Sequence, residues 1–387
     1  MDVVKVAREL IRTRSLPGEE RDVAYLIRDF LGEAGVDRVF IDGWGNVIGV
    51  VEGGVEGSIV FEGHMDHVPE GDLSRWNVDP YGGVITDDRL YGRGSVDMKG
   101  AIASMIVSAS LLGDGRVLPT VYYVFVPFEE ISEGTLFRLA LEDSLRIRPE
   151  LVVLGEATDL NMHIGHRGRS VFRVLLRGRA AHASMPWEGV NPLLAAGRLF
   201  TILEDSIGKL PVHGVLGRSS FAPTIIECSP RSTPLIPDRC TIWIDYRMVL
   251  GETEDSIKEF FEGKLELLKH EGRVLDYSIE VNSGEAVMWT GKRITYRDFY
   301  PSWLIEQNKV ERLYEIVHKT NPSTEIGVWR FSTDGVYSAG IAGIATIGIG
   351  PGDEKLAHQP NEHVPIKHLQ KTTQIYKTII EKSLRPN

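Results

Sequence analysis

The stretch SVFRVLLRGRA (170–180) is the first of six segments whose order decides the fold of the middle of the chain. We expect it to form a strand, and the residues after it predict a helix, two strands, a helix and a strand. The order β-α-β-β-α-β is that of a ferredoxin-like unit, a self-contained small α+β domain. The five later segments are NPLLAAGRLFTILEDSI (191–207), APTIIECS (222–229), RCTIWIDYRMV (239–249), TEDSIKEFFEGKLELLKH (253–270) and DYSIEVN (276–282).

The segments on either side of this unit alternate helices and strands. Such an order predicts an α/β layer with helices on both faces of a sheet. We therefore predict one α/β domain, 1–168 and 292–387, that is interrupted by an inserted domain, 169–291. The expected helices lie near 2–14, 19–35, 97–113 and 366–382, and the expected strands near 46–52, 57–63 and 120–128.

The composition limits the classes of partner. With 387 residues, 42% of them hydrophobic, the chain is long enough for two domains that each bury a core. A formal net charge of -11 without a run of Lys or Arg disfavours nucleic acid and anionic membranes as partners. We therefore expect a small-molecule substrate, no nucleic-acid partner and no membrane partner.

Two further features bear on the compartment. The first residues, MDVVKVARELIRTR (1–14), place apolar residues at helical spacing between charged ones, which predicts an amphipathic helix and not a signal segment. The only cysteines, Cys228 and Cys240, are too few for a disulfide scaffold and do not have CxxC spacing. We expect a cytoplasmic protein in which both cysteines are buried structural thiols.

Candidate metal ligands follow the predicted strands, and one opens the next helix. Ligands collect at the carboxyl ends of strands in open α/β sheets, so these side chains are expected to converge on one crevice. The candidates are His64 and Asp66 after SIVFEG, Glu129 and Glu130 after VYYVFVPF, Glu156 after LVVLG, His358 after AGIATIGIGPGDEKLA, and Asp97 at the start of a helix.

Each candidate also has a plainer interpretation. Asp97 could be the N-cap of its helix, a lone His64 or His358 could be a structural histidine, and Glu129 with Glu130 could be solvated. However, adjacent carboxylates directly after a long apolar run are costly unless a cation receives them. Without a metal site, a separate plain explanation would be needed for each of these residues. One shared metal site explains all of them, so the pattern as a whole favours it.

The donor set restricts the metal. Two imidazoles with several carboxylates suit zinc, cobalt or manganese better than calcium or magnesium, which prefer all-oxygen shells. The lack of thiolate ligands argues against a closed structural zinc site, and open coordination positions suit catalysis.

Eight ordered motifs resemble the dinuclear zinc hydrolases of the M20 type, which include acetylornithine deacetylase, succinyl-diaminopimelate desuccinylase, aminoacylase and carboxypeptidase G. The resemblance covers nearly the whole chain, and YPSW, FSTDGV and IGIGPGDE look most like the branch linked to selenium metabolism. It implies a mixed-sheet metallopeptidase catalytic domain with an inserted lid and dimerisation domain. The motifs are GHMDHVPEG (63–71), WNVDPYGG (76–83), LYGRGSVDMKGAIA (90–103), FEE (128–130), GEAT (155–158), GHRGR (165–169), AHASMPWEGVNP (181–192) and GDEKLAHQPNEHV (352–364).

The resemblance also implies roles for the candidate ligands. Asp97 resembles the carboxylate that bridges two metal ions, zinc being expected and cobalt or manganese being alternatives. His64 and Glu156 would complete one ion, and Glu130 and His358 the other. Asp66 resembles the carboxylate that fixes the tautomer of a ligand histidine, and Glu129 resembles the general base that activates the water held between the ions. The peptide bond between Asp97 and Met98 is expected to be cis.

Three residues of the inserted domain bear on the substrate. His182 resembles a histidine that reaches the partner subunit's site in dimeric relatives, although it could be a plain surface histidine. Arg247 could clamp a substrate carboxylate with two hydrogen bonds or serve only as an ion-pair partner. Pro234 stands where many relatives carry a substrate-binding asparagine, and proline offers neither a side-chain hydrogen bond nor an N–H.

Three functions remain open at this point. The first is a deacylase that cleaves an N-acyl amino acid or a related small amide, acting as a homodimer. The second is a dipeptidase or carboxypeptidase with the same metals and base. The third is a catalytically silent metal-binding protein that kept the fold, which the retention of Glu129 and every expected ligand disfavours.

Overall fold

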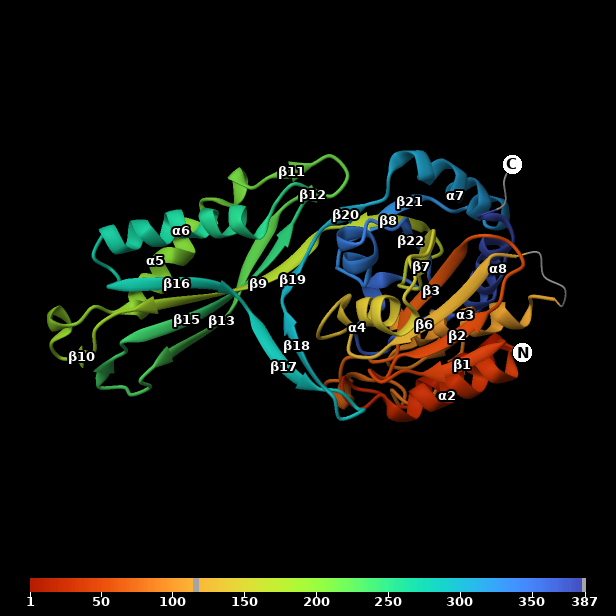
Figure 1. Cartoon of the computed structure of the whole chain (residues 1–387). Helices are drawn as coiled ribbons and strands as arrows, with labels where there is room; N and C mark the ends of the chain where they lie inside the picture. The colour runs from red at the N-terminus through yellow and green to blue at the C-terminus, as the bar shows by residue number, and fades with distance from the viewer. Residues whose placement is uncertain (114–117, 385–387) are drawn as a thin grey trace. The chain divides into compact units, whose positions relative to one another are not determined.

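The computed structural model describes residues 1–113 and 118–384, and it separates into two compact units. Unit 1 comprises Met1–His166, Glu285–Tyr296 and Trp303–Asn387, and unit 2 comprises Arg167–Gly284 and Arg297–Ser302. Most elements of both are labelled in Figure 1. Within the described residues, no helix is both long and apolar enough to cross a bilayer.

Unit 1 is built around a mixed sheet in which β6, β3, β7 and β22 run parallel to one another. The strands β1 and β2 add to one side of the sheet in the antiparallel sense. Across the sheet the order is β1-β2-β6-β3-β7-β22-β8-β20, and β21 also pairs with β8. The bounds are β1 (Arg38–Ile41), β2 (Val47–Val51), β3 (Ser58–His64), β6 (Thr120–Val126), β7 (Leu151–Leu154), β8 (Met162–His166), β20 (Trp303–Leu304), β21 (Ile326–Trp329) and β22 (Thr346–Gly348).

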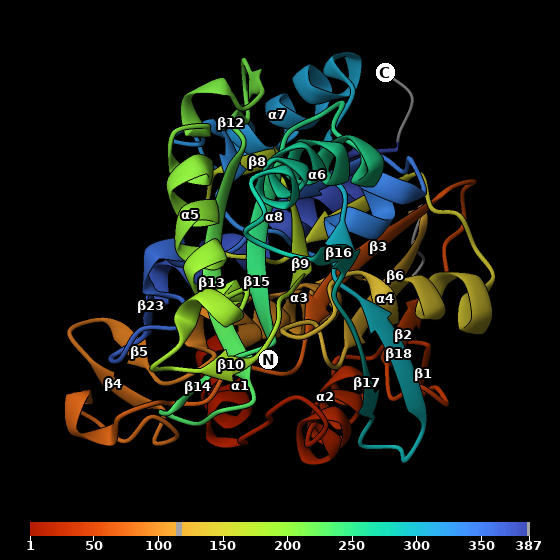
Figure 2. The ribbon, with the colours of Figure 1, turned by 90° about the vertical axis from the view of Figure 1, so that its left-hand side faces the viewer.

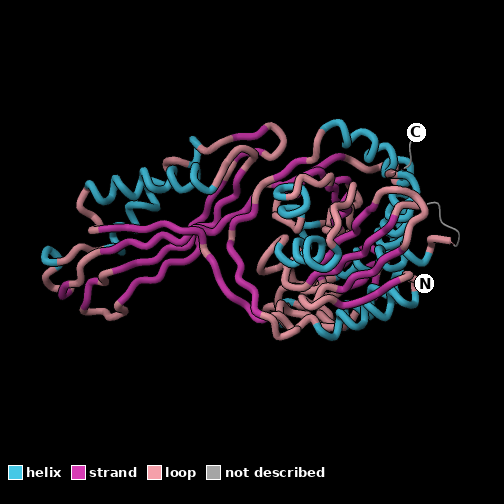
Figure 3. The backbone as a smooth tube through the Cα atoms, viewed as in Figure 1, coloured by secondary structure: helices cyan, strands magenta, loops and turns pink. Residues whose placement is uncertain are grey.

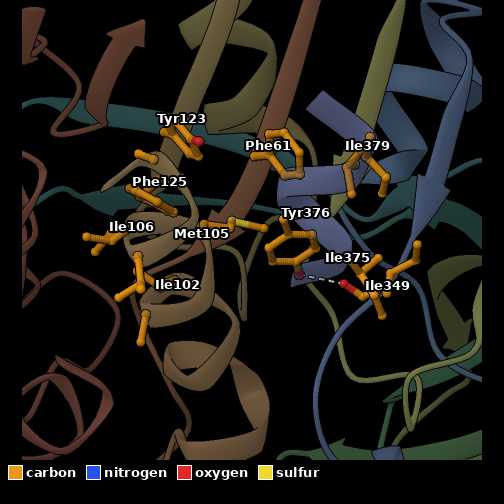
Figure 4. Packing of buried hydrophobic residues seen from close by; sticks show 14 of the residues in the cluster. Phe61, Ile102, Met105, Ile106, Tyr123, Phe125, Ile349, Ile375, Tyr376 and Ile379 are labelled. Carbon is orange, nitrogen blue, oxygen red and sulfur yellow. Dashed lines mark hydrogen bonds between the residues drawn. The ribbon is translucent and has the colours of Figure 1, made fainter. Parts of the chain in front are cut away.

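Both faces of this sheet are covered, which is why its central strands read as continuous apolar runs. In β3, Ile59 and Phe61 pack in one cluster with the larger helices, whereas Val60 packs in a second cluster with α4 (Thr135–Leu139). Figure 4 shows the first cluster, where the Tyr376 hydroxyl donates to the carbonyl of Ile349. The larger helices are α1 (Val3–Arg12), α2 (Arg21–Glu33), α3 (Gly100–Ser110), α7 (Gln307–Thr320) and α8 (Ile366–Lys382).

Unit 2 has the predicted β-α-β-β-α-β order, and its sheet follows the order β13-β15-β9-β16, with β19 beside β9. Two helices cover one face of this sheet (Figures 2 and 3). Alternate residues of the central strands, such as Phe172, Val174 and Ile244, face these helices and are buried. The bounds are β9 (Gly168–Arg177), α5 (Pro192–Glu204), β13 (Ser220–Ser229), β15 (Arg239–Met248), α6 (Glu254–His270), β16 (Asp276–Val281) and β19 (Phe299–Tyr300).

The prediction of two separate thiols is wrong. Cys228 on β13 lies directly opposite Cys240 on β15, with their Cα atoms 4.1 Å apart, and the two form a disulfide. Cys240 is buried and Cys228 is partly buried. A sequence separation of 12 residues gave no sign of this pairing, because the pairing depends on the register of two strands.

Candidate metal centre

The candidate ligands of unit 1 lie at the carboxyl ends of three neighbouring parallel strands. His64 is the last residue of β3, Glu129 and Glu130 follow β6, and Glu156 follows β7. The register pairs His64 with Val126 on β6 and Glu62 with Leu154 on β7, so β3 and β6 end level with each other and β7 ends two residues earlier. The strand pairing alone therefore brings these side chains to one place.

Two ligands arrive on loops. Asp97 lies in the π-helical turn Ser95–Lys99 with φ -124° and ψ 88°, and α3 begins only at Gly100, so Asp97 is not the N-cap of that helix. The peptide bond from Asp97 to Met98 is cis. His358 follows the short 3-10 helix Glu354–Leu356 and adopts a left-handed backbone conformation, with φ +62°.

Asp97 lies between the two histidines. His64 Nε2 is 2.9 Å from Asp97 Oδ1, and His358 Nε2 is 3.0 Å from Asp97 Oδ2. His358 Nε2 is also 3.2 Å from Glu130 Oε1, and His64 Nε2 is 3.6 Å from Glu156 Oε1. Each oxygen of Asp97 thus faces a different histidine, and each histidine faces one further carboxylate.

The donor atoms form two overlapping groups, His64 with Asp97 and Glu130, and His64 with Glu129 and Glu156, each within 4.8 Å. Imidazole nitrogens together with carboxylate oxygens fit zinc, cobalt or manganese. His64, Glu129 and Glu156 are buried, whereas His358 is exposed. The centre is therefore closed on the strand side and accessible on the His358 side.

The electrostatics of the cluster favour a bound cation. Burial raises the pKa of Glu129 and of Glu156 well above the usual range, and burial together with Asp97 raises the pKa of Glu130. For Asp97, hydrogen bonds from His358 and His64 outweigh the effect of burial and lower the pKa. Several carboxylates share this small volume, and their charges are costly to bury unless cations neutralise them.

The pKa values of both histidines are raised, which favours their charged forms. Hydrogen bonds to Asp97 and Glu130 raise the pKa of His358 to about 10. His64 is buried, which disfavours its charged form, but the nearby carboxylates of Asp66 and Asp97 outweigh burial and raise its pKa. Both ring nitrogens of His64 face acceptors, so a metal ion would replace the proton on Nε2.

Asp66 supports the centre in two ways. His64 Nδ1 donates to the Asp66 backbone carbonyl over 3.0 Å, whereas the nearest carboxylate oxygen of Asp66 is 3.6 Å away. The carboxylate itself accepts the backbone N–H groups of Glu129 and Glu130, both at 3.1 Å. The tautomer of His64 is thus set mainly by a main-chain oxygen, and the Asp66 side chain orients the two glutamates.

The remaining candidates lie in unit 2 and are not part of this cluster. His182, at the end of β10 (Ala181–His182), is exposed, and its Nδ1 accepts the N–H of Ser184 at 3.1 Å. Arg247 directs both Nε and Nη2 at Asp245, over 2.7 and 3.2 Å. The carbonyl of Pro234 accepts the N–H of Ala183, next to His182.

Sequence reasoning missed a set of buried charged residues around the ligands. Arg93, Lys99 and Glu362 are buried, and their contacts cross between segments far apart in the chain. Arg93 and Lys99 lie in the motif LYGRGSVDMKGAIA, and Glu362 lies in GDEKLAHQPNEHV. Both motifs had been singled out for the metal ligands that they contain, and no function was predicted for these three residues.

Comparison with known proteins agrees with the geometry. The pattern of the family described as Peptidase family M20/M25/M40 matches residues 60–382. The chain is 30% identical to the uncharacterized protein YgeY of Escherichia coli (strain K12) over 386 residues, which is 98% of this chain and 93% of YgeY. It is 26% identical to succinyl-diaminopimelate desuccinylase of Cereibacter sphaeroides, covering 98% of each chain.

Among solved structures, aminopeptidase PepT of Bacillus cereus aligns with a TM-score of 0.76 over 99% of this chain and 98% of its own, at 21% identity. At this identity the likeness shows a shared fold. The family match spans most of the chain and includes every metal-ligand candidate identified above. The protein is a hydrolase of peptide or amide bonds that belongs to peptidase family M20/M25/M40.

Proposed function

We propose that the protein is a two-metal amidohydrolase that removes the acyl group from an N-acyl amino acid or a related small amide bearing a carboxylate. The observation that carries this proposal is the position of Asp97, which directs one oxygen toward each histidine of the centre. A carboxylate placed in this way suits a bridging ligand. Dinuclear sites stabilise both the attacking and the leaving atoms of a displacement.

Five residues would hold the ions. His64 and Glu156 would bind one, Glu130 and His358 the other, and Asp97 both. Two divalent ions, zinc first and cobalt or manganese as alternatives, would lower the pKa of a bound water from about 15.7 toward about 7. Three carboxylate ligands leave a formal surplus of one positive charge, because four positive charges meet three negative ones. The loaded site therefore favours an anionic substrate.

Glu129 is the proposed general base. It belongs to the inner group of donors with His64 and Glu156, and its backbone N–H is fixed by Asp66. Burial raises the pKa of its carboxyl, which suits a group that must take a proton from water and return it to the departing amine. Without that proton an amine is a poor leaving group.

Unit 2 would recognise the substrate and a second copy of the chain. Arg247, already held by Asp245, is the proposed clamp for a substrate carboxylate. His182 is the proposed contribution to the partner's site in a homodimer. Unit 2 exposes several large apolar side chains that a partner would cover, namely Met185, Trp187, Leu193, Leu194, Ile225 and Ile226, of which Trp187 is 73% exposed.

A peptidase is the alternative. PepT, whose fold this chain shares, is an aminopeptidase, whereas the desuccinylase relative is a deacylase. The proposed ligands and base serve both reactions, so the choice depends on the end of the substrate that unit 2 recognises. A silent metal-binding protein is disfavoured because Glu129 is present and held in place.

The test is amine release from a panel of N-acyl amino acids and dipeptides by the zinc- or cobalt-loaded protein and by a Glu129→Gln variant shown to retain both metals. We expect the native protein to cleave an N-acyl amino acid and the variant to be slower by about 10²–10⁴-fold, the contribution of a general base. Cleavage of dipeptides alone would select the peptidase. An unchanged rate in the variant would refute the role of Glu129.

A further inference from the structure

We propose that Glu362 is a positioning residue, held by Arg93, that fixes the backbone of Asp97 relative to the loop carrying His358. The inference rests on the two-metal function proposed above. Glu362 lies 265 residues from Asp97 in the sequence and is fully buried. Its carboxylate accepts hydrogen bonds from Arg93 and from two main-chain N–H groups, so it acts on Asp97 through the main chain.

The side chain and the main chain of Glu362 both bind the segment that leads into Asp97. Glu362 Oε1 accepts the N–H of Val96 at 2.8 Å and the N–H of Asp97 at 3.2 Å. The Glu362 carbonyl oxygen accepts the N–H of Gly92 at 2.9 Å. One residue therefore holds both ends of the turn that presents the Asp97 carboxylate.

Arg93 fixes the other oxygen of this carboxylate. Its Nη1 donates to Glu362 Oε2 over 2.6 Å, and both side chains are buried, with exposed fractions of 2% and 0%. The guanidinium also lies over the Trp76 ring, 5.3 Å from its centroid. With one oxygen held by Arg93, the other stays directed at the two N–H groups, and charge-assisted hydrogen bonds of this kind are among the strong ones.

The same segment carries His358. Four residues after His358, Glu362 leads into β23 (His363–Pro365), which pairs with β5 (Arg89–Tyr91), the strand directly before Gly92. Asn361 adds a second attachment, because its Oδ1 accepts the N–H of Asn77 at 2.7 Å. The two loops that supply Asp97 and His358 are thus joined at Glu362, which sets the 3.0 Å separation between Asp97 Oδ2 and His358 Nε2.

This geometry predicts an unequal effect on the two ions. Losing the acceptor at position 362 frees the Asp97 turn from the His358 loop, but it leaves His64 at the end of β3 and Glu156 directly after β7. The ion bound by Glu130 and His358 should therefore weaken more than the ion bound by His64 and Glu156. Loss of a partner that orients metal ligands typically costs about 10–100-fold in metal affinity.

Single variants would be hard to interpret, because removing one partner of a buried ion pair leaves an unpaired buried charge and strongly destabilises the fold. Two double variants avoid this problem. Arg93→Met/Glu362→Gln removes the charges and keeps a side-chain oxygen that can accept the two N–H groups. Arg93→Met/Glu362→Met removes the charges and the acceptor together.

The experiment is a titration of the metal-free proteins with Zn²⁺ in competition with a chromophoric chelator, with folding checked by circular dichroism. His358→Asn and His64→Asn identify which binding step belongs to which ion. Glu252→Gln is the matched control, since the Glu252 carboxylate accepts the N–H of Val249 at 2.7 Å within unit 2, and we expect it to change neither step.

We expect the Arg93→Met/Glu362→Met variant, which lacks the acceptor, to weaken the step that His358→Asn removes by about 10–100-fold. The Arg93→Met/Glu362→Gln variant should stay close to the native protein. The inference would be overturned if the two double variants bound Zn²⁺ with the same affinity at both steps. It would also be overturned if the Arg93→Met/Glu362→Met variant lost the same affinity at both steps. A native protein that binds fewer than two ions would overturn the two-metal function itself.

Discussion

Units 1 and 2 differ in how many charged side chains they bury. Unit 1 buries many of them around its sheet ends, whereas among the described residues of unit 2 the buried polar side chains are three serines and Asp298. The core of unit 2 is an ordinary apolar layer between two helices and a sheet. Among the described residues of unit 1, the buried acidic, basic and histidine side chains are Glu20, Glu62, His64, Asp66, His67, Arg93, Lys99, Glu129, Glu133, Glu156, His163, His166, Asp334 and Glu362.

This difference in buried charge indicates that the buried charges of unit 1 serve function more than stability. Buried charges are weak sources of stability, because the loss of hydration offsets most of their attraction. Unit 1 keeps them because a metal centre needs carboxylates in a dry, rigid place. We therefore expect unit 1 to depend on its ions and on pH, and unit 2 to depend on apolar packing.

The largest effect should come from metal removal. Without cations, the carboxylates of Asp97, Glu130 and Glu156 repel one another in a small buried volume, and the water-activating charge is lost. We expect activity to disappear on treatment with a chelator. Backbone amide exchange should rise at residues 92–100, 126–133 and 354–364, and it should not change in β9 and β15.

Restoring Zn²⁺ should reverse both changes, which controls for irreversible damage by the chelator. Equal loosening of β9 and β15 would contradict the idea that only unit 1 relies on the ions.

Removing a core ring from unit 2 should have the next largest effect. Phe261 on α6 is buried and lies 5.7 Å from Phe172 and 6.0 Å from Tyr246 between ring centroids. A Phe261→Ala variant should lose about 3–5 kcal/mol of unfolding free energy, since it leaves a cavity. Urea unfolding measures this loss, and the affinity for Zn²⁺ should not change.

Phe260→Ala is the matched control, because Phe260 is the next residue on the same helix and is only partly buried. Its variant should lose clearly less. If Phe261→Ala also weakened metal binding, the two units would not be energetically separate.

Much of the fold was predictable from local patterns. The apolar strands near 57–63 and 120–128 and the β-α-β-β-α-β insertion rest on periodicity and composition, and the structure has them. His64, Glu129 and Glu156 converge because neighbouring parallel strands end at the same edge of the sheet, and the positions of these residues at strand ends could be predicted from the sequence.

What could not be predicted depends on contacts between distant segments. The pairing of β23 with β5 brings Glu362 to Asp97, and the register of β13 on β15 places Cys228 opposite Cys240. Nor does any local pattern show that His64 is oriented by a carbonyl and not by the Asp66 carboxylate.

A third prediction concerns acid. His67 is buried in unit 1, where its Nε2 accepts the N–H of Ser15 at 3.0 Å, and burial followed by the charges of Lys99 and Arg93 lowers its pKa to about 3. Because the folded pKa lies below the unfolded one, the unfolded chain binds the proton more readily between about pH 6.5 and pH 3. Stability from this residue is full above about pH 6.5 and falls as the pH is lowered.

At about pH 5 the loss should be about 2 kcal/mol, from about 1.4 kcal/mol per pH unit. A His67→Gln variant should therefore lose less unfolding free energy than the native protein between about pH 7 and about pH 5, as measured on metal-free protein. His270→Gln, at the exposed end of α6, is the control. Parallel pH profiles for native protein and His67→Gln would contradict the assignment.

The smallest effect is expected from a surface ion pair of unit 2. Glu254, in the first turn of α6, accepts a hydrogen bond from Arg297 at 2.6 Å and lies 2.7 Å from Lys258 Nζ. The Arg297 contact lowers the pKa of Glu254 to about 2, so the ionised form stabilises the fold above pH 4.5 and the benefit is lost as the pH falls toward 2.

A Glu254→Gln variant should lose only about 0.5 kcal/mol at about pH 7 and low salt, and less in about 0.5 M NaCl, because water and ions screen ion pairs at the protein surface. Urea unfolding at the two salt concentrations measures the difference. The buried Arg93–Glu362 pair of unit 1 lies at the other extreme, since losing one partner there costs about 3–5 kcal/mol. A loss of about 3–5 kcal/mol in the Glu254 variant would show that burial does not account for the difference between the two ion pairs. The buried charges of unit 1 would then need an explanation other than the metal centre.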